Sequence, residues 1–448
     1  MKRGFLKSEK AFSKNEPPKN RTDVANQSKN SVNTVQIVPT PTVPALHGGD
    51  GKLTADYHDD QWLLSTQPRY PPGATLVKYP DGWSECFITG HAQRKIINTP
   101  GFPEPLPRPN PSCFRISDSP GKGLGMFAAR DIKMGDLIIA ERALLILPRA
   151  FTPPDRVPAH FTEEQTKRAS AKAYEQYLEG VVQRLPLESQ VAFKQLRCSR
   201  NQDDGSGPIY NTVMTNLFMI YDYFEPSYGK PGIPEGYGCY GRVFKTLSRI
   251  NHSCRPNAQQ DWDSPSFSLQ IRASRDIMKD EEIFITYIPR IMDPAPARQE
   301  QLEPYRFRCD CQACSNPIVS DERCRRIEKV GLLRRTIQIN RNDMRWVHEQ
   351  LIDPSLECLT LIEEEGLQNE ELYRGLLSRL ADSYSLLGDT AEETKWTRMY
   401  DVVRQAQYNA RNPLNEAARI REEAVQRSNK ENLAKIGAIK GQSFTVTL

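Results

Sequence analysis

The chain has 448 residues, which is enough for two or three domains, and 38% of them are apolar, which is enough for packed cores. Lys and Arg total 60 against 56 Asp and Glu, and the net charge of +4 argues against direct nucleic-acid binding. No apolar run approaches the roughly 20 residues that span a bilayer, and the N-terminus lacks an apolar signal core, so we expect no membrane association and an intracellular protein, in the nucleus, the cytoplasm or both.

The N-terminal part is rich in Pro and polar residues, with 15 of the 34 prolines in the first 111 positions. We expect residues 1–54 to be a disordered tail. Residues 55–111 are predicted to be a partly ordered, Pro-rich extension, because aromatic residues such as Trp62 and Trp83 favour burial against the body of the protein. PGFPEPLPRPNP, residues 100–111, is typical of an extended spacer.

Short β-type runs separated by glycine turns begin at residue 112 and predict hairpins. The runs before the insert are Phe114–Ile116, Met126–Ala128, Leu137–Ile139 and Ala143–Leu147. Apolar residues at helical spacing then predict a helical insert over about 150–205. β-type texture resumes at 237–290, most clearly at Leu269–Arg272 and Ile283–Tyr287.

Two segments on either side of the insert resemble each other. ARDIKMGDLIIAE, 129–141, and SRDIMKDEEIFITY, 274–287, share Arg-Asp-Ile, a charged turn and an apolar strand. The pattern indicates two similar hairpins, and leaves open whether the repetition is generic or marks a structural pairing.

Residues 319–438 are predicted to form a helical region. Leu376, Leu380 and Leu387 lie on one helical stripe, and Gly388 marks a break before a second helix. The pair is similar to one tetratricopeptide unit, which serves either for packing or as a groove for a protein partner. Residues 439–448 are expected to be a tail.

Ten cysteines are scattered along the chain, a pattern that suits a reducing compartment better than a disulfide framework. The one tight cluster, in YRFRCDCQACSNP, places Cys309, Cys311 and Cys314 in a C-x-C-x-x-C pattern. A tetrahedral zinc site requires a fourth ligand. Cys324 would complete a local site, and local spacing alone does not exclude it.

Three further motifs contain candidate functional residues. The backbone N–H groups of GKGLG, 121–125, can closely approach an anion. The alternative interpretation is a plain turn. RINHSCRPNAQ, 249–259, concentrates hydrogen-bonding groups, but a Cys254 nucleophile with His252 as its base is disfavoured, because neighbouring residues of an extended chain point apart. Tyr287 in EEIFITYIPR, taken alone, is typical of a core tyrosine.

Together GKGLGMFA, NHSCRPN, EEIFITYI and a cysteine-rich tail resemble the SET-domain protein-lysine methyltransferases, over roughly residues 112–318. The resemblance is closer to the SMYD-type branch, in which an insert splits the SET domain and a helical region follows it. SMYD proteins carry a MYND zinc finger in the split, whereas residues 149–215 contain only Cys198, so no such finger can form here. The resemblance implies an α+β fold: a split SET domain over 112–290, a zinc-bound post-SET segment over 291–318, and the helical region.

The resemblance also implies the ligands and the site residues. Zinc would be shared between the post-SET cysteines and the NHSC motif, and the implied ligands are Cys254, Cys309, Cys311 and Cys314. S-adenosylmethionine would be the cofactor, with Lys122 pairing with its carboxylate, Phe307 stacking on its adenine, and further contacts from Gly123, Leu124, Asn216, Ser248, Asn251, His252 and Tyr287. Tyr287 would be the catalytic tyrosine, and Phe218 and Tyr305 would complete the channel for the substrate lysine.

The predicted activity is therefore methyl transfer to a lysine side chain of a protein substrate, histone or not. The alternatives are a catalytically inactive SET-like adaptor that binds partners through its helical region, and a zinc-containing nucleic-acid-binding protein. The near-neutral charge disfavours the last of these.

Overall fold

The computed structural model describes residues 57–59, 61–71, 73–149, 160–200, 206–220, 239–331, 336–339, 344–407 and 444–447. The tail predicted over 1–54 lies outside the described residues. Among the helices that are described, none is both long and apolar enough to cross a membrane.

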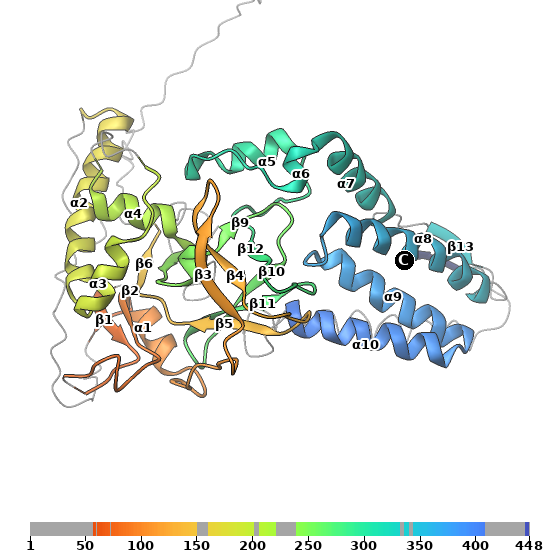
Figure 1. Cartoon of the computed structure of the whole chain (residues 1–448), viewed down its shortest axis with the longest axis horizontal. Coiled ribbons are helices and arrows are strands. Elements are labelled where there is room, and N and C mark those ends of the chain that lie inside the picture. The colour runs from red at the N-terminus through yellow and green to blue at the C-terminus, as the bar shows by residue number, and fades with distance from the viewer. Residues whose placement is uncertain are drawn as a thin grey trace, which may run out of the picture. The chain divides into compact units, whose positions relative to one another are not determined.

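A five-stranded sheet joins the N-terminal extension to the rest of the chain (Figure 1). Its order is β1 (Trp62–Gln67), β2 (Ser84–Thr89), β6 (Leu145–Pro148), β8 (Tyr240–Val243) and β7 (Phe218–Ile220). β2 pairs in parallel with β6, and all the other neighbours are antiparallel. Helix α1 (Gly90–Ile97) follows β2 and is capped by Thr89, whose side chain accepts from the Ala92 N–H. The extension thus supplies two strands of a core sheet.

Two smaller sheets complete the β-rich part, and the four-stranded one carries the three sequence motifs. One has the order β10 (Ala258–Asp263), β11 (Ser268–Ala273), β5 (Leu137–Glu141), and the other β3 (Phe114–Ser119), β4 (Gly123–Ala128), β12 (Glu282–Ile285), β9 (Asn251–His252). β3 and β4 form the predicted hairpin around Lys122. β12 runs parallel to β9, with Phe284 opposite Asn251 and Ile285 opposite His252, so the NHSC and EEIFITY motifs lie side by side.

The two similar segments at 129–141 and 274–287 pair with each other. Ile132 and Ile277 form an antiparallel bridge and exchange two backbone hydrogen bonds of 2.9 Å. Nearby, the Lys133 ammonium lies 2.6 Å from the Asp276 carboxylate. The repetition therefore marks a structural pairing, in which each segment presents its Arg-Asp-Ile turn to the other.

Helices α2 (Glu163–Gln183), α3 (Leu187–Lys194) and α4 (Pro208–Asn216) occupy the insert between β6 and β7. Thr162 and Gln165 form a capping box at the start of α2. The Tyr177 ring stacks on Phe87 with centroids 5.6 Å apart, and the Tyr174 hydroxyl donates to the Pro148 carbonyl at 2.7 Å. These contacts hold α2 against strands β2 and β6.

The C-terminal part is helical, as the sequence predicts. Its helices are α5 (Ala295–Gln301), η3 (Glu303–Tyr305), α6 (Gln312–Ser315), α7 (Pro317–Gly331), α8 (Met344–Glu365), α9 (Glu371–Leu387) and α10 (Thr390–Gln407). α9 ends at Gly388, whose φ of 80° lies in the left-handed region that favours glycine. β13 (Thr336–Ile339) and β14 (Phe444–Thr447) form an antiparallel pair that the sequence analysis missed.

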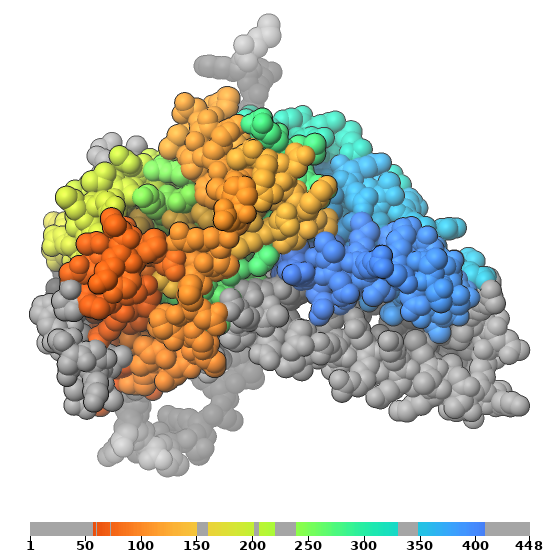
Figure 2. Space-filling model, turned by 60° about the horizontal axis from the view of Figure 1, so that its bottom comes forward, coloured from red at the N-terminus to blue at the C-terminus, as the bar shows by residue number. Residues whose placement is uncertain are grey.

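The described chain has two apolar cores. One fills the β-rich part, and the other joins α7, α8, α9 and α10 to the segment around Cys254, Ile288 and Ile291. Figure 2 shows helices α9 and α10, in blue, adjoining the β-rich part in orange and green. Short strands, mostly antiparallel, with an α-helical region after them confirm the α+β prediction.

Candidate active site and metal centre

Four cysteine sulfurs meet directly after β9. The Sγ atoms of Cys254, Cys309, Cys311 and Cys314 all lie within 4.8 Å of one another. The Cys254 Sγ is 3.9 Å from that of Cys309 and 3.6 Å from that of Cys314. Tetrahedral Zn–S bonds of about 2.3 Å imply sulfur separations of about 3.8 Å, so the four thiols fit zinc in number, type and spacing.

Cys324, the local alternative, lies outside this group. It is buried in α7, and its Sγ accepts a hydrogen bond from the Arg255 Nη2 at 3.2 Å. The structure thus brings Cys254 to the post-SET cysteines, across 55 positions from Cys309. The four-cysteine cluster therefore joins the cysteine-rich tail to the NHSC motif.

His252 lies between the metal centre and Tyr287. Its Nδ1 accepts a hydrogen bond from the Tyr287 N–H at 3.0 Å, and its Nε2 lies 3.4 Å from the Cys254 sulfur. The expectation that His252 and Cys254 point apart is wrong, because residues two positions apart share one face of an extended chain. Burial lowers the pKa of His252 to about 4, so the imidazole is neutral and, with Nδ1 as acceptor, carries its proton on Nε2. Nδ1 thus joins the NHSC segment to Tyr287, and Nε2 lies against the Cys254 sulfur of its own segment.

A network of hydrogen bonds connects the GKGLG turn to the NHSC motif. The Asn251 amide donates to the Leu124 carbonyl at 3.2 Å and to the Glu282 carboxylate at 2.7 Å. Glu282 also accepts from the Ser119 hydroxyl at 2.9 Å. A Cβ at Gly125 would collide with the Glu282 carboxylate, which explains the glycine at this position. The sequence analysis did not identify Glu282, although a charged residue opening an apolar strand beside the motif was a usable signal.

Lys122 and Phe307 approach this network from two sides. The Lys122 ammonium lies 3.3 Å from the Asp310 carboxylate and 5.2 Å from the centre of the Phe284 ring. The Phe307 ring centre is 6.0 Å from that of His252. The structure therefore places the GKGLG turn, Asn251, His252 and the post-SET segment around one region of the molecule.

A cavity of about 300 Å³ collects the other predicted residues. Asn216, Phe218, Ser248, Tyr287 and Tyr305 all line it. The rings of Tyr287 and Tyr305 are 5.0 Å apart between centroids. The Tyr287 hydroxyl donates to the Ile250 carbonyl at 2.6 Å, and burial raises the pKa of Tyr287, so the phenol stays neutral at physiological pH. The two aromatic rings and the neutral polar groups favour the neutral amine of a lysine side chain over its charged ammonium form, because burial disfavours the charge.

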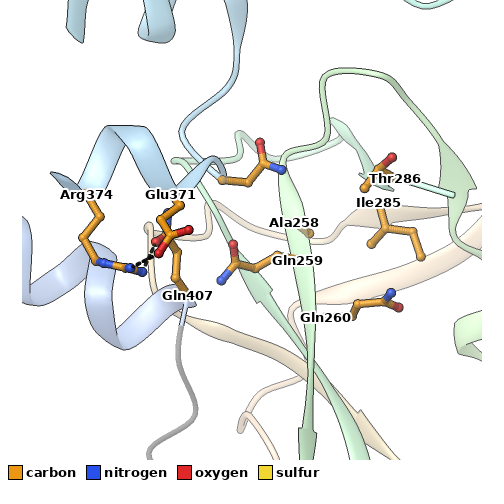
Figure 3. A pocket seen from close by; sticks show the side chains of 9 residues that line it. Ala258, Gln259, Gln260, Ile285, Thr286, Glu371, Arg374 and Gln407 are labelled. Carbon is orange, nitrogen blue, oxygen red and sulfur yellow. Dashed lines mark hydrogen bonds and ion pairs between the residues drawn. The ribbon is translucent and has the colours of Figure 1, made fainter. Parts of the chain in front are cut away.

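A second cavity, of about 340 Å³, adjoins the first and shares Gln260, Ile285 and Thr286 with it. Figure 3 shows that its remaining walls come from β10 and from the helices α9 and α10. On the helical side the Arg374 guanidinium donates to the Gln407 side chain at 2.8 Å and to Glu371 at 3.2 Å. The sequence analysis named none of these residues, since their proximity depends on how the helices pack.

The comparisons with known proteins bear on the domain that carries this site. The family model described as "SET domain" matches residues 123–288. Residues 123–288 therefore form a SET domain, and the candidate site lies within and beside it.

Within this class the chain is similar to Set5-type and SMYD-type proteins. It is 27% identical over 268 residues to "Histone-lysine N-methyltransferase set5" of Schizosaccharomyces pombe, an alignment that covers 60% of this chain and 69% of that protein. It is 36% identical over 72 residues to "Histone-lysine N-methyltransferase SMYD3" of Homo sapiens, covering 16% of each. The match to "Histone-lysine N-methyltransferase ASHR1" of Arabidopsis thaliana is 24% identical and covers 46% of this chain and 55% of that protein. The chain thus spans less than two thirds of the last two relatives.

Among solved structures, the chain is similar to "Structure of Rubisco LSMT bound to AdoMet", with 13% identity, a TM-score of 0.23, and 68% of this chain and 92% of that chain covered.

Proposed function

We propose that the protein is a protein-lysine N-methyltransferase that uses S-adenosylmethionine and methylates the side-chain amine of lysine in a protein substrate. The SET domain and the names of its relatives support this class of activity. The structural observation that carries the proposal is the 300 Å³ cavity, where Tyr287 and Tyr305 face a space beside the Asn251 and His252 motif.

Each part of the site has a role in this reaction. When bound, S-adenosylmethionine supplies a methyl group on a positively charged sulfur. The substrate amine attacks only without its proton, and its pKa of about 10.4 in water must fall, which partly buried aromatic walls promote by disfavouring the ammonium. With the cofactor held beside the Asn251 and His252 motif, the neutral amine would take up the methyl group, the N–C bond replacing the S–C bond whose electron pair would stay on sulfur. Catalysis of this kind rests on positioning the amine and the methyl group in line.

The remaining residues hold the reactants and the fold of the site. Tyr287 would orient the amine, and Phe218 and Tyr305 would flank the lysine side chain. Asn216, Ser248, Asn251, His252 and the GKGLG turn would bind the cofactor, with Phe307 against its adenine. Zn²⁺, when bound, would be held by Cys254, Cys309, Cys311 and Cys314 and would keep Phe307 in place. A nuclear or cytoplasmic location and a protein partner for the C-terminal helices remain predictions.

The test has two stages. Calorimetry with S-adenosylmethionine should give saturable binding to the purified, zinc-loaded chain, and radiolabelled cofactor should then label lysines in a lysate, identified by mass spectrometry. Binding without transfer to any protein would favour the inactive adaptor, and absence of binding would contradict the proposal.

A further inference from the structure

The segment that follows helix α3 in the insert lies against the GKGLG turn. Arg197 donates from Nη1 to the Lys122 carbonyl at 3.1 Å, and the same nitrogen is 3.8 Å from where a Cβ on Gly123 would lie. The Arg197 carbonyl in turn accepts a hydrogen bond of 2.7 Å from the side-chain amide of Asn216, which lines the 300 Å³ cavity. Two predicted site residues therefore contact Arg197. Asn216 holds its backbone, and its guanidinium reaches Lys122.

Neighbouring contacts fix this segment on both sides. The Gln195 carbonyl accepts from the Arg249 guanidinium at 3.0 Å, two positions before the NHSC motif. The Ser199 N–H donates to the Thr215 hydroxyl at 3.2 Å. Hydrogen bonds thus hold this segment to both sides of the candidate active site. Arg197 is exposed, and its guanidinium is the cationic group that this segment places at the glycine turn.

The two cations at this turn differ in their partners. The Lys122 ammonium is paired with Asp310 at 3.3 Å, whereas among the described residues Arg197 has no carboxylate partner. Arg197 also lies close enough to Tyr287 for its charge to oppose, in part, the effect of burial on the pKa of that phenol. An exposed guanidinium beside a glycine turn, with donors left over after one bond to a carbonyl, suits a carboxylate ligand.

We propose that Arg197 binds the α-carboxylate of S-adenosylmethionine, a role that the sequence alone assigns to Lys122. The inference rests on the proposed function. The planar guanidinium matches a carboxylate in a two-pronged geometry that a lysine ammonium does not offer. The helical insert is then part of the cofactor site, and Arg197 selects ligands that carry the amino-acid carboxylate.

The test compares S-adenosylmethionine with its decarboxylated form, which lacks only the carboxylate. Calorimetry is carried out on the zinc-loaded full chain, on Arg197→Gln and Arg197→Lys, and on Lys194→Gln as a control for a nearby exposed cation. Arg197→Gln should weaken binding of S-adenosylmethionine by at least about ten-fold and leave binding of the decarboxylated form unchanged. Arg197→Lys should recover part of the loss, and Lys194→Gln should match the wild type.

Three results would overturn the inference while leaving the proposed function intact. They are an unchanged affinity in Arg197→Gln, an equal loss for both ligands, and a larger carboxylate-specific loss in Lys122→Gln than in Arg197→Gln. If the wild-type chain binds neither ligand, the proposed function itself fails and this inference fails with it.

Discussion

Tyr287 contacts its neighbours through three different groups. Its N–H donates to His252, its hydroxyl donates to the Ile250 carbonyl, and its ring packs against that of Tyr305 at the cavity wall. A core tyrosine would also pair its buried hydroxyl, as Tyr287 does with Ile250, so this bond alone does not assign a role. The proposed role of Tyr287 in methyl transfer depends on its phenol oxygen, and a test of that role has to remove this atom.

Tyr287→Phe tests this role with little risk to the fold. The variant keeps the ring and the backbone bond to His252 and removes the phenol oxygen alone. We expect kcat to fall by about 100-fold or more, the usual effect of removing one oriented hydrogen-bonding group from an active site, while the Kd for S-adenosylmethionine stays within about two-fold. Single-turnover transfer of labelled methyl groups measures the first quantity and calorimetry the second. Near-normal turnover would contradict the role.

Arg298 is a fully buried cation beside the four thiols. Its Nη2 lies 3.8 Å from the Cys314 sulfur, and its Nη1 lies 3.1 Å from the Asp321 carboxylate. Four thiolates around Zn²⁺ carry a net charge of −2, and a guanidinium against one sulfur offsets part of it without being a ligand. The sequence analysis did not predict this contact, because Arg298 lies in a helix of ordinary polar composition.

Arg298→Met should therefore release zinc to a chelator about ten-fold faster or more than the wild type, with Arg298→Lys in between because it keeps the charge. An indicator dye follows the release. Asp321→Asn is the matched control: it breaks the ion pair that Arg298 makes with α7 but leaves the cation on the sulfur. If Asp321→Asn loses zinc as fast as Arg298→Met, the effect belongs to the fold and not to the charge.

At the scale of elements, α5 and the cysteine-rich loop that follows it within the post-SET segment act as one unit. The Gln299 side chain donates to the Phe307 carbonyl at 2.9 Å and accepts from the Cys309 N–H at 3.1 Å. Gln299 thus fixes the backbone of Phe307, whose ring is proposed to cover the adenine, and the backbone of Cys309, which belongs to the cysteine cluster. We therefore expect metal binding and cofactor binding to be coupled through Gln299 and its bonds to the Phe307 and Cys309 backbones.

Cys309→Ser, or removal of zinc by a chelator, should lower the affinity for S-adenosylmethionine by about ten-fold or more, because Phe307 loses its anchor. Metal content by atomic absorption and cofactor binding by calorimetry are measured on the same samples. Cys198→Ser, which changes an exposed cysteine outside the cluster, should alter neither. A zinc-free Cys309→Ser protein with wild-type cofactor affinity would show that the two sites are independent.

The elements also show how far the sequence alone could lead. The hairpin around Lys122 and the two helices that meet at Gly388 follow from local periodicity and turn residues, the α+β class follows from the resemblance, and the structure confirms all three. The parallel pairing of β9 with β12 and the bond from Arg197 to Lys122, 75 positions apart, depend on tertiary packing that no local pattern encodes. The resemblance to SET domains implied only that the two motifs share one site and gave no strand pairing, and nothing in the sequence indicated the bond from Arg197 to Lys122.

At the scale of the whole described molecule, one residue beside the metal centre joins the β-rich part to the C-terminal helices. Arg255 directly follows Cys254 and donates to the Cys254 carbonyl at 2.6 Å. It also donates to the Glu365 carboxylate at the end of α8 at 2.8 Å and to the Ser320 hydroxyl of α7 at 2.9 Å. The side chains of Arg255 and Glu365 are only 6% and 5% exposed. This buried ion pair thus joins α8 to the segment that carries Cys254.

Glu365→Ala should lower the free energy of unfolding by about 3–5 kcal/mol, because it leaves the Arg255 charge buried without its carboxylate partner. Glu357→Ala is the matched control on the same helix. Its ion pair with Arg326 is half exposed on both sides, so its loss should cost less than about 1 kcal/mol. Urea denaturation followed by circular dichroism measures both. The double variant Arg255→Met with Glu365→Met should be more stable than Glu365→Ala alone, since it removes both charges together. Equal, small losses in Glu365→Ala and Glu357→Ala would mean that α8 is held to the β-rich part by apolar packing alone.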